Sequence, residues 1–209
     1  MHSHDLARPI LRLRKVEDVP AIQALLARVY PPPHGPEAIW PAESLRSHLE
    51  RFPEGQMVVE SDGVIIGSAT TQRVSMKEAI EPHTWSRITG RGSLTTHDPG
   101  GDALYGVNIA VDPAWQGRGV GRLLYQGRID LGRGLGCRAF VAGARIPGYH
   151  NVATAMSPEA YVEAVVAGRI FDPTLSKQIG LRFQVRGVLR DYAHDVETLG
   201  HAALIVMEL

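Results

Sequence analysis

The sequence predicts one mixed α/β domain with about seven strands, and three observations support this class. Segments with the two-residue alternation of strands and segments with helical spacing follow one another along the chain. One of them, residues 107–124, runs from an apolar strand through a glycine-rich loop into an amphipathic helix. The 209 residues, 44% apolar and 21% charged, suffice for one sizeable core and argue against disorder.

The first third of the chain has clear element signals. Apolar and basic residues alternate from Ile10 to Arg14, which is typical of a strand. Asp18 precedes Pro20 and an apolar stripe at helical spacing, and the prolines at 31–33 are expected to end that helix. We therefore expect strands at 10–14, 56–60 and 64–71, the last two forming a hairpin, and helices after Asp18 and at 43–51.

Residues 75–101 interrupt this regular pattern with prolines, histidines and several glycine-containing turns. We interpret them as an insertion before the central strand, with a short helix at 76–81. A connection of this length within one domain is usually functional or disordered. Two interpretations therefore stay open: a cover over the substrate side of the site, or a mobile surface loop.

The second half of the chain continues the alternation. The helix that begins at Val120 is expected to end at the glycine-rich residues 132–136. A second insertion at about 143–173 includes a helix start at Ser157-Pro158. The remaining expected elements are a strand at 138–142, a helix from Asp172 to about 179, and closing strands at 183–189 and 202–207.

The loop at 116–121, QGRGVG, predicts an anion site. Its three glycines remove side chains that would keep a ligand from the backbone. The helix that follows directs unpartnered amide groups and the positive end of its dipole into the loop. We therefore expect a phosphate or pyrophosphate to bind there.

Two common phosphate-binding motifs do not fit this loop. A P-loop requires Gly-Lys-Ser/Thr, whereas Gly121 is followed by Arg122 and Leu123. A dinucleotide fingerprint requires G-x-G-x-x-G and an acidic residue roughly 20 positions later, and neither is present. A nucleotide-binding module for ATP or NAD is therefore disfavoured, and a coenzyme A site remains.

Residues 107–124, VNIAVDPAWQGRGVGRLL, resemble motif A of the GNAT (GCN5-related) N-acetyltransferases: a strand, an Asp-Pro turn, Gln/Arg-x-x-Gly-x-Gly/Ala and a helix. More loosely, 145–150 and 183–189 resemble a GNAT subgroup often joined to a carbon-nitrogen hydrolase domain. With 209 residues, we expect the GNAT-like domain (1–209) alone.

The resemblance implies a mostly antiparallel central sheet, flanked by helices and splayed between its fourth and fifth strands. Acetyl-CoA would lie in the splay, with its pantetheine arm along the fourth strand and its pyrophosphate on the loop. The implied coenzyme A residues are Ile109, Ala110, Val111, Gln116, Gly117, Arg118, Gly119, Val120, Gly121 and Arg122. The implied activity is acyl transfer from acetyl-CoA to a primary amine of a small molecule or peptide, by direct attack in a ternary complex.

Acyl transfer needs two proton transfers, because the attacking amine must lose a proton and the coenzyme A thiolate must gain one. No glutamate occurs between Glu81 and Glu159, where many GNAT enzymes have one. The family's frequent tyrosine before the last strand pair is replaced by Gln178 when the sequences are aligned on Phe183. The candidates for the base are Asp102, Tyr105, Asn108 acting through water, and His150. For the acid they are Tyr149, Tyr161 or water.

These two departures also suggest an alternative, a noncatalytic acyl-CoA-binding regulatory protein. Lys+Arg and Asp+Glu number 22 each, so no strong basic field favours nucleic acid or a membrane surface. We expect no metal site, no membrane span and no signal peptide. A single cysteine, Cys137, fits a reducing cytoplasm, and a homodimer is compatible with the family.

Overall fold

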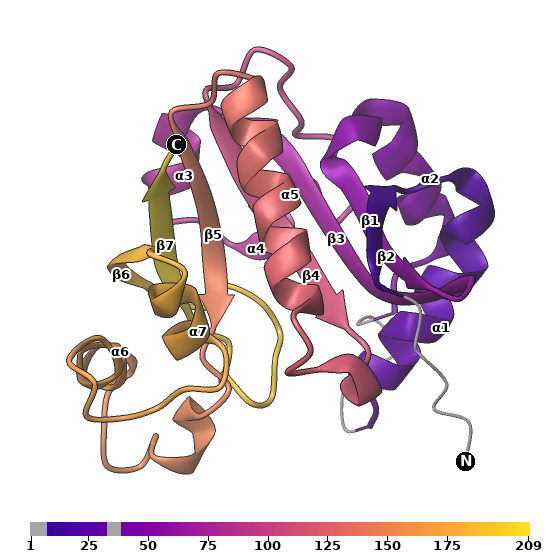
Figure 1. Cartoon of the computed structure of the whole chain (residues 1–209). Helices are drawn as coiled ribbons and strands as arrows, with labels where there is room; N and C mark the ends of the chain where they lie inside the picture. The colour runs from indigo at the N-terminus through magenta and orange to yellow at the C-terminus, as the bar shows by residue number, and fades with distance from the viewer. Residues whose placement is uncertain (1–7, 33–38) are drawn as a thin grey trace, which may run out of the picture.

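The computed structural model describes residues 8–32 and 39–209. These residues form one seven-stranded sheet in the order β1-β2-β3-β4-β5-β7-β6 (Figure 1). The β4–β5 pair is parallel and the other five pairs are antiparallel. The strands are β1 (Ile10–Leu13), β2 (Gln56–Ser61), β3 (Val64–Val74), β4 (Ala103–Val111), β5 (Ala139–Arg145), β6 (Gln184–Leu189) and β7 (Ala202–Glu208). The predicted mixed, mostly antiparallel sheet is confirmed.

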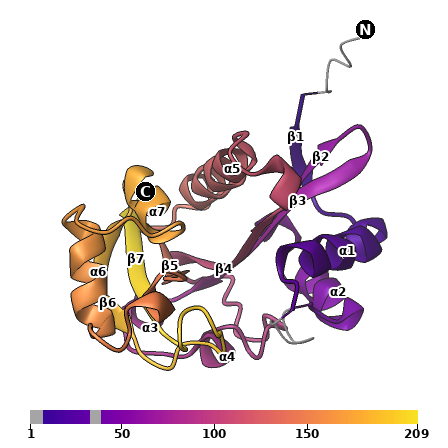
Figure 2. The same cartoon turned by 90° about the horizontal axis from the view of Figure 1, so that it is seen from below.

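Helices cover both faces of the sheet (Figure 2). Four pack on one face: α1 (Val19–Val29), α2 (Ala42–Arg51), α3 (Met76–Ile80) and α4 (Trp85–Ile88). On the other face α5 (Val120–Gly134) lies over the middle strands, with α6 (Pro158–Val166) and α7 (Leu175–Gly180) beyond it over β5, β6 and β7. Within 8–32 and 39–209, every helix is too short or too polar to cross a lipid bilayer.

Local signals explain where several elements begin and end. The Ser157 hydroxyl accepts a hydrogen bond from the Ala160 amide at 3.2 Å, so Ser157 and Pro158 start α6 as predicted. Ser75 caps α3 in the same way. The first helix ends at Val29, ahead of Pro31, whereas Pro33 lies outside the described residues.

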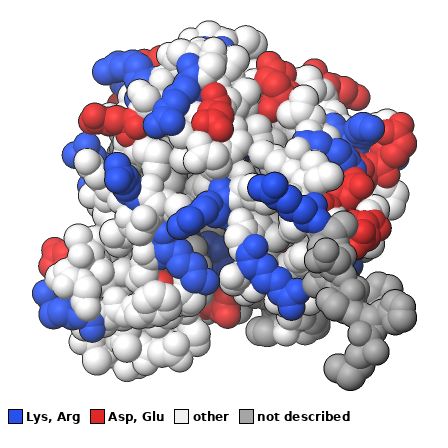
Figure 3. Space-filling view, viewed as in Figure 1, with Lys and Arg blue, Asp and Glu red and all other residues white. Residues whose placement is uncertain are grey.

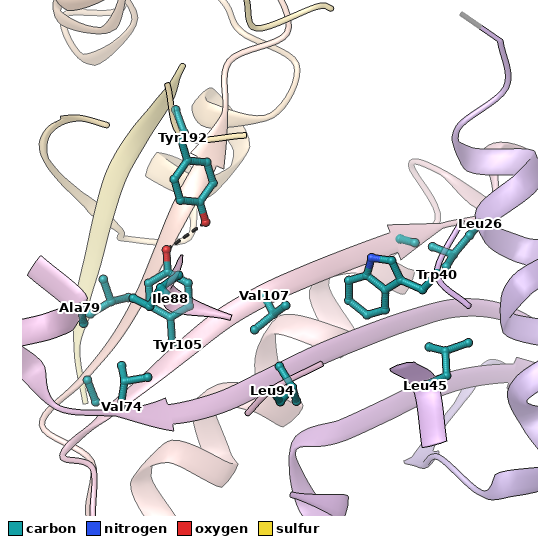
Figure 4. Close-up of a cluster of buried hydrophobic side chains, with 14 of the residues drawn as sticks. Leu26, Trp40, Leu45, Val74, Ala79, Ile88, Leu94, Tyr105, Val107 and Tyr192 are labelled. Carbon is teal, nitrogen blue, oxygen red and sulfur yellow. Dashed lines mark hydrogen bonds between the residues drawn. The ribbon is translucent and has the colours of Figure 1, made fainter. Parts of the chain in front are cut away.

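The segment 75–101 packs against the core on the α1 side of the sheet (Figure 4). It contributes Ala79, Ile88 and Leu94 to the same buried cluster as Trp40 and Val107. The short helix expected at 76–81 is α3, and α4 is an additional helix. The alternative of a mobile surface loop does not fit a segment that buries these side chains in the core.

Two irregularities in β4 fork the sheet. The register with β3 moves from Thr70↔Asn108 to Thr71↔Gly106, so Val107 is an extra residue in β4, a β-bulge. The parallel pairing with β5 runs from Ala103↔Ala139 to Gly106↔Ala142. Beyond that point β4 continues to Val111, whereas β5 follows β7 to Arg145. The predicted splay between the fourth and fifth strands is therefore confirmed, directly after the bulge.

The observed β4 is longer than the strand expected at 107–111, because it already begins at Ala103. The first four residues are buried and pair with both neighbours. Gly106 and the glycine-rich turn before Ala103 weaken the strand signal in the sequence. In the folded protein, pairing with β3 and β5 forms the strand despite that weak propensity.

Candidate functional site

The glycine-rich loop connects the end of β4 to the start of α5. Asp112 caps a short 3₁₀ turn (Pro113–Trp115), and the loop then reaches α5 through Gly117 and Gly119, whose φ values are +74° and +86°. This left-handed conformation favours glycine over any residue with a Cβ atom. A Cβ atom at either position would meet no protein atom within 4 Å, so the space above the loop is open.

The amides at the start of α5 are directed into this open space. Gly119 is the N-cap, and its carbonyl accepts the first intrahelical hydrogen bond from Leu123 N at 3.0 Å. The amides of Val120, Gly121 and Arg122 precede that bond and have no intrahelical acceptor. Arg118 and Arg122 are exposed beside them, and Figure 3 shows Lys and Arg side chains gathered where α5 begins. The loop therefore combines backbone donors with positive charge, as an anion site requires.

Several contacts hold the loop and α5 in place. The Asp112 carboxylate accepts hydrogen bonds from Ala114 N (3.0 Å) and from Arg28 Nε of α1 (2.7 Å). The start of α5 lies directly on β3, because a Cβ atom on Gly67 would be 2.8 Å from Val120 Cγ1. A glycine at 67 is thus a packing requirement of the loop, although it lies 50 residues away in the sequence.

The free half of β4 presents backbone groups to the splay. Asp112 N donates to Ile66 O at 2.9 Å, which is a bond of the β3–β4 ladder. Because antiparallel partners alternate between bonded and non-bonded pairs, Ile109 and Val111 turn their N–H and C=O groups away from β3, toward the splay. The Gln116 side chain reaches Val111 O at 3.5 Å, which agrees with that orientation.

Polar side chains gather on the opposite face of the sheet, beside the splay. Asn108 Nδ2 donates to the Tyr30 hydroxyl at 3.3 Å, and burial raises the pKa of Tyr30 above its ordinary value. The Arg145 guanidinium lies over the Tyr30 ring at 5.9 Å. The same guanidinium donates to both Asp195 and Glu197 of the β6–β7 loop. The end of α1, both splayed strands and the β6–β7 loop therefore meet at one place.

The structure separates the catalytic candidates. Asn108 lies at the splay itself, and Tyr105 is fully buried one residue before the β4–β5 pairing ends, with its hydroxyl bonded to His83 and Tyr192. Asp102 lies at the other end of β4, where it accepts from Met76 N at 2.6 Å and pairs with Arg138.

The remaining candidates follow the end of β5. Tyr149 is buried, with its ring 5.6 Å from the ring of Tyr161. His150 is exposed, and its Nδ1 donates to the Pro147 carbonyl at 2.7 Å. Their roles stay predictions. The residues predicted to bind coenzyme A, Ile109, Ala110, Val111 and 116–122, lie together where β4 ends and α5 begins.

Gln178 of α7, at the position where many family members have tyrosine, is buried and donates from Nε2 to the hydroxyl of Tyr125 at 2.8 Å. The Phe183 ring packs edge to face against both Tyr125 of α5 and Phe140 of β5. Sequence reasoning did not identify Tyr125 as the partner of this residue.

Sequence reasoning also missed Tyr30, Arg145, Tyr192 and His83 as site residues. Each lies beside a predicted element: the end of the first helix, the strand at 138–142, the two closing strands and the insertion at 75–101. Their proximity to Asn108 and the splay depends on contacts between residues far apart in the sequence, which spacing does not report.

Comparisons with known proteins agree with this geometry. Residues 19–154 match the model of the "Acetyltransferase (GNAT) family". The uncharacterized N-acetyltransferase YkwB of Bacillus subtilis (strain 168) is 34% identical over 188 residues, covering 90% of this chain and 83% of YkwB. The probable hydrolase YhcX of the same organism is 40% identical over 156 residues, 75% of this chain. The chain spans only 30% of the length of YhcX.

Solved structures share the fold. The GphF GNAT-like decarboxylase in complex with isobutyryl-CoA superposes with a TM-score of 0.77 at 24% identity, covering 95% of this chain and 98% of that chain. The loading GNATL domain of CurA from Lyngbya majuscula gives 0.78 at 19% identity, over 96% and 98%. The putative acetyltransferase yncA of Salmonella typhimurium, with its cofactor acetyl-CoA, gives 0.59 at 18% identity, over 96% and 94%.

Proposed function

Because the chain belongs to the GNAT acetyltransferase family, whose acyl donor is an acyl-CoA, we propose that it transfers the acetyl group of acetyl-CoA to a primary amine of a small molecule or peptide. The attack is direct, in a ternary complex. One observation carries the proposal: the open amides at the start of α5 lie beside the splayed edge of β4, so one ligand with a diphosphate and an amide-rich arm can use both.

In this proposal the diphosphate of coenzyme A binds the amides from Gly117 to Arg122, with Arg118 and Arg122 adding charge. The pantetheine arm bonds Ile109 and Val111 as an added strand would, since their backbone groups turn toward the splay. Gln116 orients the loop through Val111 O, and Ala110 anchors the strand in the core below.

The acceptor amine enters from the face of Asn108, Tyr30 and Arg145. This face lies across the sheet from α5, so the amine and the diphosphate do not compete for space. Asp195 and Glu197 bring negative charge to the entrance, which attracts an amine that arrives as ammonium. Their pairing with Arg145 holds the β6–β7 loop beside the splay.

The direct test is calorimetric titration of coenzyme A and acetyl-CoA into Gly119→Glu. A carboxylate at this position faces the bound diphosphate, and two like charges about 4 Å apart near a protein surface repel by a few kcal/mol, so we expect affinity to fall roughly 100-fold or more. Gly136→Glu is the matched control. Gly136 also has a left-handed φ of +68° and open space around it, but it lies beyond the other end of α5.

Equal affinities in the two variants would refute the site. Turnover is followed by thiol release from acetyl-CoA with a panel of primary amines. Binding of acetyl-CoA with no acyl transfer to any amine would instead favour the alternative of a noncatalytic acyl-CoA-binding regulator.

A further inference from the structure

A chain of three hydrogen-bonded side chains crosses the core between the segment 75–101 and β5. His83 Nε2 lies 2.7 Å from the Tyr105 hydroxyl. The Tyr105 hydroxyl lies 2.9 Å from the Tyr192 hydroxyl (Figure 4). His83 Nδ1 lies 2.7 Å from the carbonyl of Glu81. The exposed fractions are 9% for His83, 0% for Tyr105 and 6% for Tyr192, so bulk water does not interrupt the chain.

The hydrogen bonds of this chain run in one direction. The Glu81 carbonyl can only accept, so Nδ1 of His83 carries the proton and Nε2 of the neutral ring accepts from Tyr105. The Tyr105 oxygen in turn accepts from Tyr192. Burial lowers the pKa of His83 and raises the pKa of Tyr105 and Tyr192, so all three groups rest in their neutral forms at neutral pH.

One end of the chain lies at the splay. Tyr105 pairs with Val141, one residue before the parallel pairing of β4 and β5 stops. A Cβ atom on Gly143, the first residue of β5 beyond that pairing, would be 2.7 Å from the Tyr192 hydroxyl. The Tyr192 hydroxyl therefore lies directly under the fork of the sheet, on the face where Asn108 and Tyr30 meet.

The other end lies at a cavity of about 150 Å³. His83 lines this cavity together with Glu78, Glu81 and Arg87. These three charged groups, with the two tyrosines, are the titratable neighbours that His83 faces. Arg87 opposes the positive form of His83, whereas the Glu81 carbonyl stabilises it by accepting from Nδ1.

We propose that Tyr192, Tyr105 and His83 form a proton relay for acyl transfer at the splay. The proposal rests on the proposed function and assigns a proton acceptor in place of the glutamate that the sequence lacks between Glu81 and Glu159. Tyr192 is the member that meets the reacting groups, and Tyr105 and His83 act through it.

The arriving ammonium first releases one proton to water, and the relay then balances the transfer from the neutral amine without another reactant. As the amine nitrogen bonds to the thioester carbon, its proton passes to the Tyr192 oxygen, the Tyr192 proton passes to Tyr105, and the Tyr105 proton passes to His83 Nε2. When the C–S bond breaks, the electron pair goes to sulfur. The same shifts in reverse return one proton from His83 to the thiolate, so the products are the amide and free coenzyme A with every relay residue restored.

The first test is Tyr105→Phe, which removes the middle hydroxyl and keeps the ring in the core. We expect kcat to fall about 100-fold, the usual effect of losing proton transfer, with KM for acetyl-CoA unchanged. Thr71→Val is the matched control, because it also deletes one buried hydroxyl, which donates to Gly55 O at 2.8 Å and is not a member of the chain. Its kcat should stay within about twofold of wild type.

The second test is chemical rescue of His83→Ala by added imidazole, which can enter the cavity that His83 lines. Rate recovery that saturates with imidazole is expected, since a structural role of the ring would not be replaced by a free base. His97→Ala is the control. His97 is half-buried and is stacked on Phe52 at 4.5 Å, so imidazole should not change the rate of His97→Ala.

The outcomes separate the two proposals. Full turnover in Tyr105→Phe, with no imidazole response in His83→Ala, would overturn the relay and leave acyl transfer standing. If the wild type does not bind coenzyme A, the proposed function is overturned and the relay with it. Where no amine reacts, slow hydrolysis of acetyl-CoA is the readout. A wild type that binds acetyl-CoA but transfers the acetyl group to neither amine nor water would refute both the proposed function and the relay.

Discussion

His48 is expected to make the protein sensitive to acid, and the size of the effect follows from its surroundings. The ring is buried in α2, with Nε2 donating to Gly92 O at 2.6 Å and Nδ1 at 3.5 Å from the Arg14 guanidinium. Burial, with the charge of Arg14 acting in the same direction, lowers the pKa of His48 from 6.5 to about 4, although the bond to Gly92 opposes the shift.

The sign follows from which state binds the extra proton. Below pH 6.5 the unfolded chain protonates His48, whereas the folded protein resists until about pH 4, so acid favours unfolding across this window. For these two pKa values the loss is about 2.5 kcal/mol by pH 4.5 and about 3.4 kcal/mol at its limit. This is a large share of the roughly 5–15 kcal/mol that stabilises a typical domain.

The assay is urea unfolding of wild type and His48→Gln between pH 7 and pH 4.5. Glutamine can still donate to Gly92 O but does not titrate, so the stability gap between the two proteins should shrink by about 2.5 kcal/mol as the pH falls. Leu45→Ala in the same helix truncates a buried side chain without removing a titrating group. Its gap to wild type should stay constant. A constant gap for His48→Gln as well would refute the reasoning.

Two further predictions concern α5. Gly67→Ala places a Cβ atom 2.8 Å from Val120 Cγ1 and 3.2 Å from Leu124 Cδ1, so the start of α5 must move. We expect the free energy of unfolding in urea to fall by about 1–3 kcal/mol and coenzyme A binding to weaken in calorimetry. Unchanged binding would contradict the link between the packing of α5 on Gly67 and the coenzyme A site. Arg128→Met replaces a buried guanidinium whose Nη2 has no hydrogen-bond partner in the part of the chain that the structure describes. The free energy of unfolding should stay equal or rise by up to about 1 kcal/mol, seen as an unchanged or higher melting temperature. A marked fall in melting temperature would contradict this.

The sequence predicted the parts of the site that depend on local chemistry. Glycine at 117 and 119 reports a left-handed backbone, and the apolar spacing after Val120 reports a helix, so the loop and α5 follow from neighbouring residues. The family resemblance added the splay, which the pairing of β4 with β5 confirms.

The rest depends on contacts that local patterns do not encode. Tyr105 and Tyr192 are 87 residues apart, and His83 belongs to a segment whose sequence has no clear periodicity. Gly67 reads as an ordinary strand glycine until α5 is packed on it. The limits of the single domain with its two insertions, the homodimer and the cytoplasmic location stay predictions.

The extra residue in β4 decides what each later side chain of that strand can do. A strand alternates its faces in steps of two, but Val107 and Asn108 both turn toward α1, because the bulge adds one residue. Ile109 and Val111 consequently lie beneath α5, and Ala110 lies on the opposite face. Deleting Val107 would remove the bulge and leave Asn108 in its place on the α1 face, so Ile109, Ala110 and Val111 would keep their faces. An odd insertion or deletion beyond the bulge, between Asn108 and Val111, would instead turn the side chains that follow to the opposite faces and bring hydrocarbon and polar groups to the wrong sides of the sheet.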